Sequence, residues 1–254
     1  SAAQQQAIED AFTITPAGGN TNNGTINWDY TITEGALDFL AKDETVTATF
    51  TITVDDGNGG TETQDVTVTI TGANDKPTIT ATNVAGGITE GATLNDVGSI
   101  AFADLDLTDR PTATEATKSI SALKADGETE LALTEAQLQA IENAFSITPA
   151  DGNTNNGTIN WDYTITEGDL NFLAAGETVT ATFTITVDDG NGGTETQDVT
   201  VTITGANDKL TIEVVDVAGD ITEGAALNDV GSITFADLDL TDRPTATEAT
   251  KSIS

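Results

Sequence analysis

The stretch TVTATFTITV at 178–187, DDGNGG at 188–193 and TETQDVTVTIT at 194–204 decides the fold. On both sides of the central hexapeptide, Thr alternates with Val, Ala, Phe or Ile, a pattern typical of strands with one apolar face. Asp, Gly and Asn between them favour a chain reversal, so the stretch predicts a β-hairpin. Thr supplies 49 of the 254 residues, and this β-branched composition favours strands throughout the chain.

The same hairpin occurs 133 residues earlier, and the repetition extends along the whole chain. Of the 121 positions that overlap at this shift, 103 are identical. The turn-rich segment 72–77, between two strand-like runs, is the expected boundary between repeats. We therefore expect a C-terminal part of one repeat at 1–75, a complete repeat at 76–208 and an N-terminal part of the next at 209–254.

The rest of the complete repeat also has mostly strand patterns. Short alternating runs at 99–103, 118–123 and 158–165 predict further strands. Thr134-Glu135-Ala136-Gln137 is a capping box with apolar residues at helical spacing after it, so it predicts a short helix. A second helical turn is expected at 169–173. Many short strands separated by turns predict an all-β fold of Greek-key β-sandwiches, with one short helix per repeat.

The composition excludes several functions. The chain has 42 Asp and Glu against 8 Lys and Arg, no His and no Cys, which gives a net charge of −34. Such a polyanion repels nucleic acid and anionic membranes, and no apolar run approaches the roughly 18 residues of a membrane span. Ser-His-Asp catalysis and thiolate metal sites are impossible. Oxygen ligands for a hard cation such as Ca²⁺ remain abundant.

Acidic residues cluster at three places in each repeat. Asp104-Leu105-Asp106-Leu107-Thr108-Asp109 places alternate carboxylates on one side of an extended chain, where a cation would relieve their repulsion. The hairpin turn and the linker pair Asn-Asp are the other two, and Thr-Glu-Gly near the start of a repeat adds an oxygen donor. The candidate Ca²⁺ ligands are Asp55, Asp56, Asn74, Asp75, Glu90, Asp104, Asp106, Asp109, Asp188, Asp189, Asn207, Asp208, Glu223, Asp237, Asp239 and Asp242.

Each cluster also has a plain structural interpretation, as a hairpin turn, a linker turn or a charged strand edge. The three clusters in combination indicate a Ca²⁺ site more specifically than any one of them does. We expect the linker acids, the acidic turn before the linker and the Asp-x-Asp after it to meet at the junction between two repeats. None of the clusters has the Asp-x-Asp-x-Asp-Gly spacing of an EF-hand.

The segment from Gly176 to Asp208, which ends in Thr-Gly-Ala-Asn-Asp, resembles the C-terminal half of the VCBS-type repeat. That repeat occurs in giant RTX adhesins that type I systems secrete, and the Gly-Thr-Ile-Asn-Trp-Asp-Tyr run at 157–163 is similar to one of its strands. The resemblance implies Ca²⁺-stabilised, Ig-like or cadherin-like sandwiches, outside the cell on the bacterial surface. It implies an extender that projects a distal binding domain for adhesion and biofilm formation.

The linker Asn74-Asp75-Lys76-Pro77 is similar to the cadherin linker that ends in Asn-Asp-Asn-x-Pro, and Asp104-x-Asp106 to the cadherin Asp-x-Asp motif. By this analogy, Asp55 and Asp56 fall where the preceding domain contributes ligands. Lys76 replaces an oxygen-bearing residue, which implies fewer ions per junction. In the second linker, Leu210 replaces Pro77 and removes a rigid element but no ligand.

Other functions are open from the sequence. Thr rows are a feature of ice-binding surfaces, and a glycan site would use exposed aromatic residues. Trp161 and Tyr163, however, stand at alternate strand positions typical of a core. An enzyme is disfavoured, since the adjacent Asp188 and Asp189 would point in opposite directions on a strand. The partners expected are neighbouring repeats of the same protein. The two partial repeats could also complete each other between molecules in a head-to-tail fibre.

Overall fold

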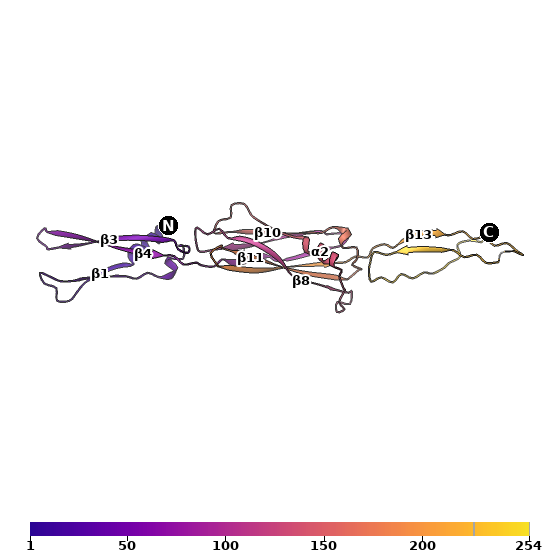
Figure 1. Ribbon diagram of the computed structural model, residues 1–254, viewed down its shortest axis with the longest axis horizontal. Coiled ribbons are helices and arrows are strands. Elements are labelled where there is room, and N and C mark those ends of the chain that lie inside the picture. Colours follow the sequence, from indigo (N-terminus) through magenta and orange to yellow (C-terminus); the bar gives the residue numbers. More distant parts are fainter. Residues whose placement is uncertain (226, 254) are drawn as a thin grey trace.

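The computed structural model describes residues 1–225 and 227–253. It is an elongated, mostly β molecule in which three units follow one another along a single axis (Figure 1). The short linkers 72–77 and 205–210 join the units and belong to no strand. The all-β prediction is confirmed, and so is the tandem arrangement of sandwiches with one short α-helix in each of the first two units.

The complete repeat, which we call the central unit, consists of two four-stranded sheets. One sheet has the order β5-β7-β10-β9, with bounds Thr78–Asn83, Asn95–Ala103, Asn156–Thr164 and Phe145–Pro149. The other has the order β6-β12-β11-β8, with bounds Ala85–Thr89, Thr194–Thr204, Thr178–Asp188 and Thr112–Leu123. Neighbouring strands are antiparallel, except that β6 pairs with β12 in parallel. The core of the central unit lies between the two sheets.

The alternation of apolar and polar side chains along the strands creates that core. In β11 every second side chain, from Val179 to Val187, is fully buried, and the intervening Thr residues are half-buried on the other face. The Phe183 ring stacks on Phe145 from the opposite sheet, with ring centroids 4.2 Å apart. Each sheet therefore supplies one apolar face, as the period of two predicts.

Trp161 fills the centre of the core because two glycines make room for it. A Cβ at Gly98 would lie 2.5 Å from the Trp161 ring, and one at Gly86 would lie 3.1 Å from it. The indole N–H donates to the Asn83 carbonyl over 2.7 Å, so the buried polar atom is satisfied. The tryptophan is thus a core residue, as its strand position predicted.

Helix α2 (Glu135–Asn143) begins at the predicted capping box, where the Thr134 and Gln137 side chains each accept a backbone N–H of the other residue. Its Ile141 is buried, and the Ile141 carbonyl accepts a hydrogen bond of 3.2 Å from the Tyr163 hydroxyl. The second helical turn lies two residues earlier than the sequence predicts, because the 3₁₀ helix η2 spans Glu167–Asp169 and is followed by a turn at 170–172.

The N-terminal unit contains α1 (Ala2–Asp10), η1 (Glu34–Ala36) and two two-stranded sheets. The sheets are β1-β2 (Phe12–Pro16, Ile26–Tyr30) and β3-β4 (Thr45–Asp55, Thr61–Thr71). Among the described residues of the C-terminal unit, the strands are the pair β13-β14 (Thr211–Asp216, Ser232–Ala236). Both end units expose apolar side chains whose counterparts in the central unit are buried. No helix among the described residues is long and apolar enough to cross a membrane.

Candidate metal centre

A group of three aspartates lies at the first linker, where the central unit begins. The carboxylates of Asp104, Asp106 and Asp109 offer oxygens within 4.8 Å of one another, and all three residues are buried. The chain leaves β7 at Ala103 and turns sharply, with the Asp106 backbone N–H donating to Oδ1 of Asp104 over 3.0 Å. This turn, rather than a continuing strand, brings the three carboxylates together.

The linker and the hairpin turn of the central unit are hydrogen-bonded to this group. The Asp75 backbone N–H donates to Oδ2 of Asp106 over 2.9 Å. The Asn74 side-chain amide donates to Oδ2 of Asp189 over 2.9 Å, and that of Asn191 donates to both Asp109 oxygens over 3.0 Å. Three segments far apart in the sequence therefore converge on one acidic site.

Burial dominates the electrostatics of the site. It raises the pKa of Asp106 to about 6, and the neighbouring Asp109, Asp104 and Asp75 add to the rise. The pKa of Asp104 is raised for the same reasons. Burial alone would also raise the pKa of Asp189, but hydrogen bonds from Asn74 and from backbone N–H groups outweigh it and lower that pKa. The site thus contains carboxylates that are costly to ionise in the absence of a cation.

No basic side chain neutralises the group in the part of the chain that the structure describes. Arg110, the nearest in sequence, donates to the Leu107 and Asp109 carbonyl oxygens instead. The ion pairs among the described residues are Lys76–Glu195 and Lys118–Asp198, both exposed. Asp104 Oδ2, Asp106 Oδ1 and Asn74 Oδ1 are buried and have no hydrogen-bond partner. Since buried polar atoms are normally paired, these three oxygens are open to a further partner, either a cation or a water molecule.

The N-terminal unit approaches the same site from the other side of the linker. Thr108 donates its hydroxyl to Oε1 of Glu44 over 2.8 Å, and the Leu107 N–H contacts the Phe39 carbonyl at 3.4 Å. Burial raises the pKa of Asp75, and the negative charges of Asp38 and Glu34 raise it further. The site is therefore shared between two units.

The second linker repeats this arrangement. Asp237, Asp239 and Asp242 form an equivalent group, and the Asp208 backbone N–H donates to Oδ2 of Asp239 over 3.1 Å. Across the junction, the Thr241 hydroxyl donates to Oε1 of Glu177 over 2.8 Å. Asp208 Oδ2 and Asp239 Oδ1 are again buried without a partner.

Glu90 belongs to this second site, although it stands early in its repeat. Strands β5 and β6 carry the chain along the whole unit, so Glu90 arrives at the far end and accepts the Ala206 N–H over 2.9 Å. Burial, followed by the charges of Asp208, Glu167 and Asp239, raises its pKa to about 7. Its Oε1 is buried and unpartnered. Glu90 therefore lies at the linker that follows its unit and not at the one that precedes it.

The acidic hairpin turn with Asp55 and Asp56 was expected to contribute ligands at the linker that follows it in the chain. This expectation is wrong. The start of β3 and the end of β4 lie beside the first linker, since Glu44 accepts the Gly72 N–H. The 11-residue strand then carries Asp55 and Asp56 roughly 36 Å away, at about 3.3 Å per residue. In Figure 1 the free end of the β3-β4 hairpin points away from the central unit. The equivalent turn that contacts Asn74 belongs to the next unit and contains Asp189.

Four other predicted residues lie outside the two groups. Asp188 and Asp55 are exposed and accept N–H groups within their own turns, from Gly190 and Gly57. Asn207 is exposed and donates to the Asp208 carbonyl. Glu223 is exposed, and no hydrogen bond joins it to either group within the described residues.

Sequence reasoning missed Glu44, Glu167, Glu177 and Asn191. Glu177 is 2% exposed and bridges the Ala174 N–H and the Thr241 hydroxyl. Glu167 accepts the Gly91 N–H and lies near enough to Glu90 to raise its pKa. The three glutamates come from turns and strand starts outside the acidic clusters, whereas Asn191 lies within the acidic hairpin turn 188–193. The only signal for the glutamates is their place before the hairpin of their unit, at the end where the chain leaves it.

The two sites have the chemistry that a hard divalent cation prefers. Carboxylate oxygens from several segments, together with the Asn74 amide oxygen at the first linker, lie around a position with excess negative charge and unpartnered oxygen atoms. The buried oxygens of Asp104, Asp106 and Asn74 fit Ca²⁺ at the first linker. Those of Glu90, Asp208 and Asp239 fit it at the second.

No protein-family model matches the sequence, and no curated protein matches it. Among solved structures, the chain is similar to PcdhgB3 EC1-4, with a TM-score of 0.38, 13% identity and coverage of 90% of this chain and 48% of that one. It is similar to mouse clustered PcdhgC3 EC1-3, with a TM-score of 0.37, 12% identity and coverage of 92% and 68%. The PapD-like domain 7 of human CEP192 gives a TM-score of 0.33, 11% identity and coverage of 52% and 86%. The chain thus spans about half the length of PcdhgB3 EC1-4, and all three similarities are distant.

Proposed function

We propose that this chain is a Ca²⁺-rigidified extender of a large bacterial surface adhesin, which projects a distal binding domain from the cell. One observation carries the proposal. At each linker, a group of three aspartates, the linker backbone and side chains of the preceding unit lie together, with buried oxygens that have no partner. A cation held there contacts both units and prevents the linker from acting as a hinge.

The role of the cation is mechanical rather than catalytic. Without it, the linker is held by a few direct contacts, such as Thr108–Glu44 and Thr241–Glu177. The carboxylates on the two sides repel each other across the linker. Ca²⁺ converts that repulsion into attraction, and extracellular modules bind it with dissociation constants of roughly 10⁻⁴–10⁻³ M. The location outside the cell and the role in adhesion rest on the resemblance to adhesin repeats.

Calcium titration of the intact chain tests the proposal. Small-angle scattering is expected to show a longer, less variable particle in Ca²⁺ than in EGTA, and the thermal midpoint is expected to rise with Ca²⁺. Mg²⁺ is the matched control, because it demands a stricter octahedral geometry and gives up its waters reluctantly. Identical scattering and melting in Ca²⁺ and EGTA would refute the proposed function.

A further inference from the structure

The hairpin turn 188–193 of the central unit packs against the first linker. Within the turn, Oδ1 of Asp189 accepts the backbone N–H groups of Asn191 over 2.6 Å and of Gly193 over 3.0 Å. Gly193 has no side chain to keep the linker away, since a Cβ there would lie 2.8 Å from the Cα of Lys76. The turn therefore places the Asn191 side chain beside the buried acidic group.

The Asn191 amide faces both carboxylate oxygens of Asp109. Its Nδ2 lies 3.0 Å from Oδ1 and 3.0 Å from Oδ2. An ionised carboxylate only accepts hydrogen bonds, so the NH₂ end of the amide must be the end that faces it. A Ca²⁺ ion that binds a carboxylate through both oxygens also faces the two of them. The partially positive NH₂ group thus lies where a cation would bind Asp109.

The other oxygens of the group are not held in this way. Asp104, Asp106 and Asn74 each keep one buried oxygen without a partner. The carboxylates of Asp104, Asp106 and Asp109 offer oxygens within 4.8 Å of one another. A cation bound to the group would therefore lie close to the Asn191 NH₂ group and be repelled by it.

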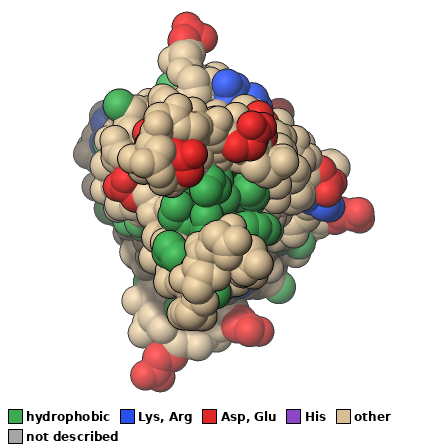
Figure 2. All heavy atoms as spheres, turned by 90° about the vertical axis from the view of Figure 1, so that its left-hand side faces the viewer, with side chains coloured by type: hydrophobic (Ala, Val, Ile, Leu, Met, Phe, Trp, Pro, Cys, Tyr) green, Lys and Arg blue, Asp and Glu red, His purple; other side chains and the backbone are tan. Residues whose placement is uncertain are grey.

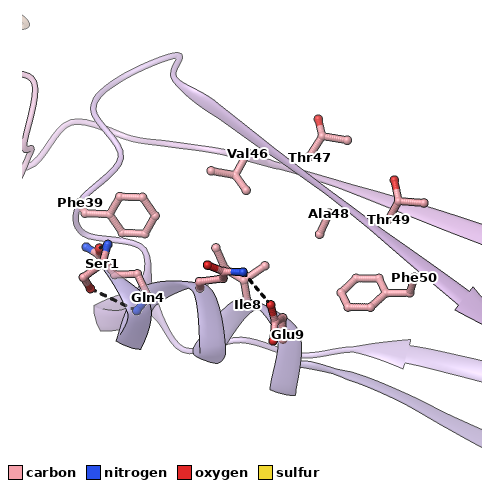
Figure 3. A pocket seen from close by; sticks show the side chains of 11 residues that line it. Ser1, Gln4, Ile8, Glu9, Phe39, Val46, Thr47, Ala48, Thr49 and Phe50 are labelled. Carbon is pink, nitrogen blue, oxygen red and sulfur yellow. Dashed lines mark hydrogen bonds between the residues drawn. The ribbon is translucent and has the colours of Figure 1, made fainter.

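Two other amides of the chain provide a comparison. On the exposed surface of α1, the Gln5 amide donates to one oxygen of Glu9 over 2.9 Å, the dashed line at Glu9 in Figure 3. Asn58 has the same place in the β3-β4 turn, but its amide donates to the Asp56 carbonyl over 3.2 Å. Figure 2 views the molecule from the end at which this turn lies, and the acidic side chains in view are spread apart. Of the three amides, Asn191 alone holds both oxygens of a buried carboxylate.

We propose that Asn191 is the metal-responsive residue of the first linker. In the metal-free chain its amide nitrogen holds Asp109, and in the loaded chain its amide oxygen faces the cation. The two ends of an amide have nearly the same size, so a half-turn of the side chain exchanges them without repacking. Asn191 is exposed, and no hydrogen bond joins its Oδ1 to another group in the part of the chain that the structure describes. The inference rests on the proposed function, because it requires a cation at the linker.

The exchange affects both states of the junction. Hydrogen bonds to an ionised carboxylate are stronger than those between neutral groups, so Asn191 stabilises the metal-free junction. Ca²⁺ must break these hydrogen bonds when it binds, and its affinity is lowered accordingly. An amide at this position therefore favours a site that takes up and releases calcium, whereas a carboxylate would favour permanent occupancy.

Asn191→Asp tests the proposal in the intact chain. In EDTA its thermal midpoint is expected to fall below that of the wild type, because the two hydrogen bonds are lost and a like charge faces Asp109. The calcium affinity of the first site is expected to rise roughly tenfold, since the new carboxylate adds to the charge of the ligand set. Asn58→Asp makes the same change in the same turn sequence away from the linker, and it is expected to change neither quantity.

The side-chain amide signals in ¹⁵N NMR spectra follow the exchange directly. The signals of Asn191 are identified by their loss in Asn191→Asp. In the wild type they are expected to shift on addition of Ca²⁺ and to exchange faster with solvent, because the NH₂ group leaves Asp109. The Gln5 signals are the internal control, since a general effect of Ca²⁺ on exposed carboxylates would move them too. The signals of Asn74 report calcium binding at the same site in both chains.

The outcomes separate this inference from the proposed function. The inference alone is overturned if Ca²⁺ raises the thermal midpoint of the wild type but leaves the Asn191 signals unchanged. It is also overturned if Asn191→Asp and Asn58→Asp behave alike in EDTA and in Ca²⁺. A wild-type midpoint that does not respond to Ca²⁺ would refute the proposed function, and this inference with it.

Discussion

The backbone N–H of Asp75 donates a hydrogen bond of 2.9 Å to Oδ2 of Asp106, while Oδ1 of the same carboxylate is buried without a partner. One oxygen thus fixes the linker to the unit that follows it, and the other remains available to a ligand. The same relationship joins Asp208 to Asp239 at the second linker. The linker geometry and the ligand capacity therefore depend on one side chain at each junction.

Asp106→Asn separates these two roles. The variant keeps an oxygen acceptor for the Asp75 N–H but removes the charge that a cation requires. We expect its thermal midpoint in EDTA to equal or exceed that of the wild type, because an unpaired buried charge is lost. Ca²⁺ at a concentration ten times the dissociation constant adds about 1.4 kcal/mol per site to the free energy of unfolding. In the variant we expect the contribution of the first site to be lost.

Calorimetry in EDTA and in Ca²⁺ measures this difference. Asp188→Asn is the matched control, because Asp188 is exposed and accepts only the Gly190 N–H of its own turn. A calcium gain in Asp106→Asn as large as in the control would exclude Asp106 as a ligand.

The stability of the metal-free chain is expected to fall as the pH rises. In the folded protein the pKa of Asp106 is about 6 and that of Glu90 about 7, above their ordinary values of 3.8 and 4.5. The folded state therefore binds more protons than the unfolded state between about pH 4 and pH 7, and stability is lost as the pH rises through this window. Ca²⁺ competes with these protons, so its stabilising effect is expected to grow over the same window.

Thermal melts from pH 4.5 to 8, with EDTA and with Ca²⁺, test both parts of this prediction. If the thermal midpoint of the metal-free chain rises steadily towards pH 8, the pKa values of Asp106 and Glu90 are not raised in the folded state.

The hydroxyl–carboxylate contacts across the linkers hold the units together without a metal. Thr108→Val removes the donor to Glu44 and keeps the shape of the side chain. We expect a net loss of about 0.5–1.5 kcal/mol from the junction, typical of one hydrogen bond, and a broader range of angles between the two units in EDTA.

Spin labels on Thr63→Cys and Glu115→Cys, one exposed position in each unit, report the distance distribution. The chain has no cysteine of its own, so labelling is specific. In Ca²⁺ the variant and the wild type are expected to give similar narrow distributions. Equal widths in EDTA would contradict a role for the Thr108 hydroxyl.

Gly98→Ala is expected to destabilise the central unit by about 1–3 kcal/mol, as overpacking typically does. The added Cβ would lie 2.5 Å from the Trp161 ring, whose indole N–H is fixed on the Asn83 carbonyl. Gly87→Ala is the matched control, since a Cβ there meets no atom within 4 Å. Denaturation followed by tryptophan fluorescence measures both, and similar midpoints would show that the Trp161 packing is looser than described.

The sequence was sufficient for the strands, the hairpin and the capped helix, because each depends on a local pattern. Val179 to Val187 alternate with Thr, and Thr134 and Gln137 stand at the spacing of a capping box. The position of the acids at the linkers was also predictable for Asp75 and Asp106, since both lie close to the boundary in the chain.

The direction in which each strand carries its acids could not be read from the sequence. Asp189 returns to the first linker because β11 runs back along the unit, and Glu90 reaches the second because β5 and β6 run forward. Both placements depend on pairings between strands far apart in the sequence, of β6 with β12 for Glu90 and of β8 with β11 for Asp189. Glu177 was missed for the same reason, since its partner Thr241 lies in the next unit.

The parallel pairing of β6 with β12 determines how the central unit responds to a pulling force. The chain enters this unit at Pro77 and leaves at Gly205, at opposite ends, so tension is applied along the strands. Residues 85–89 are then dragged against residues 200–204, and the ladder between them is loaded in shear. Its hydrogen bonds must break together rather than one after another, as in the peeling of a hairpin. The unit is thus built to resist extension along the axis on which the three units are arranged.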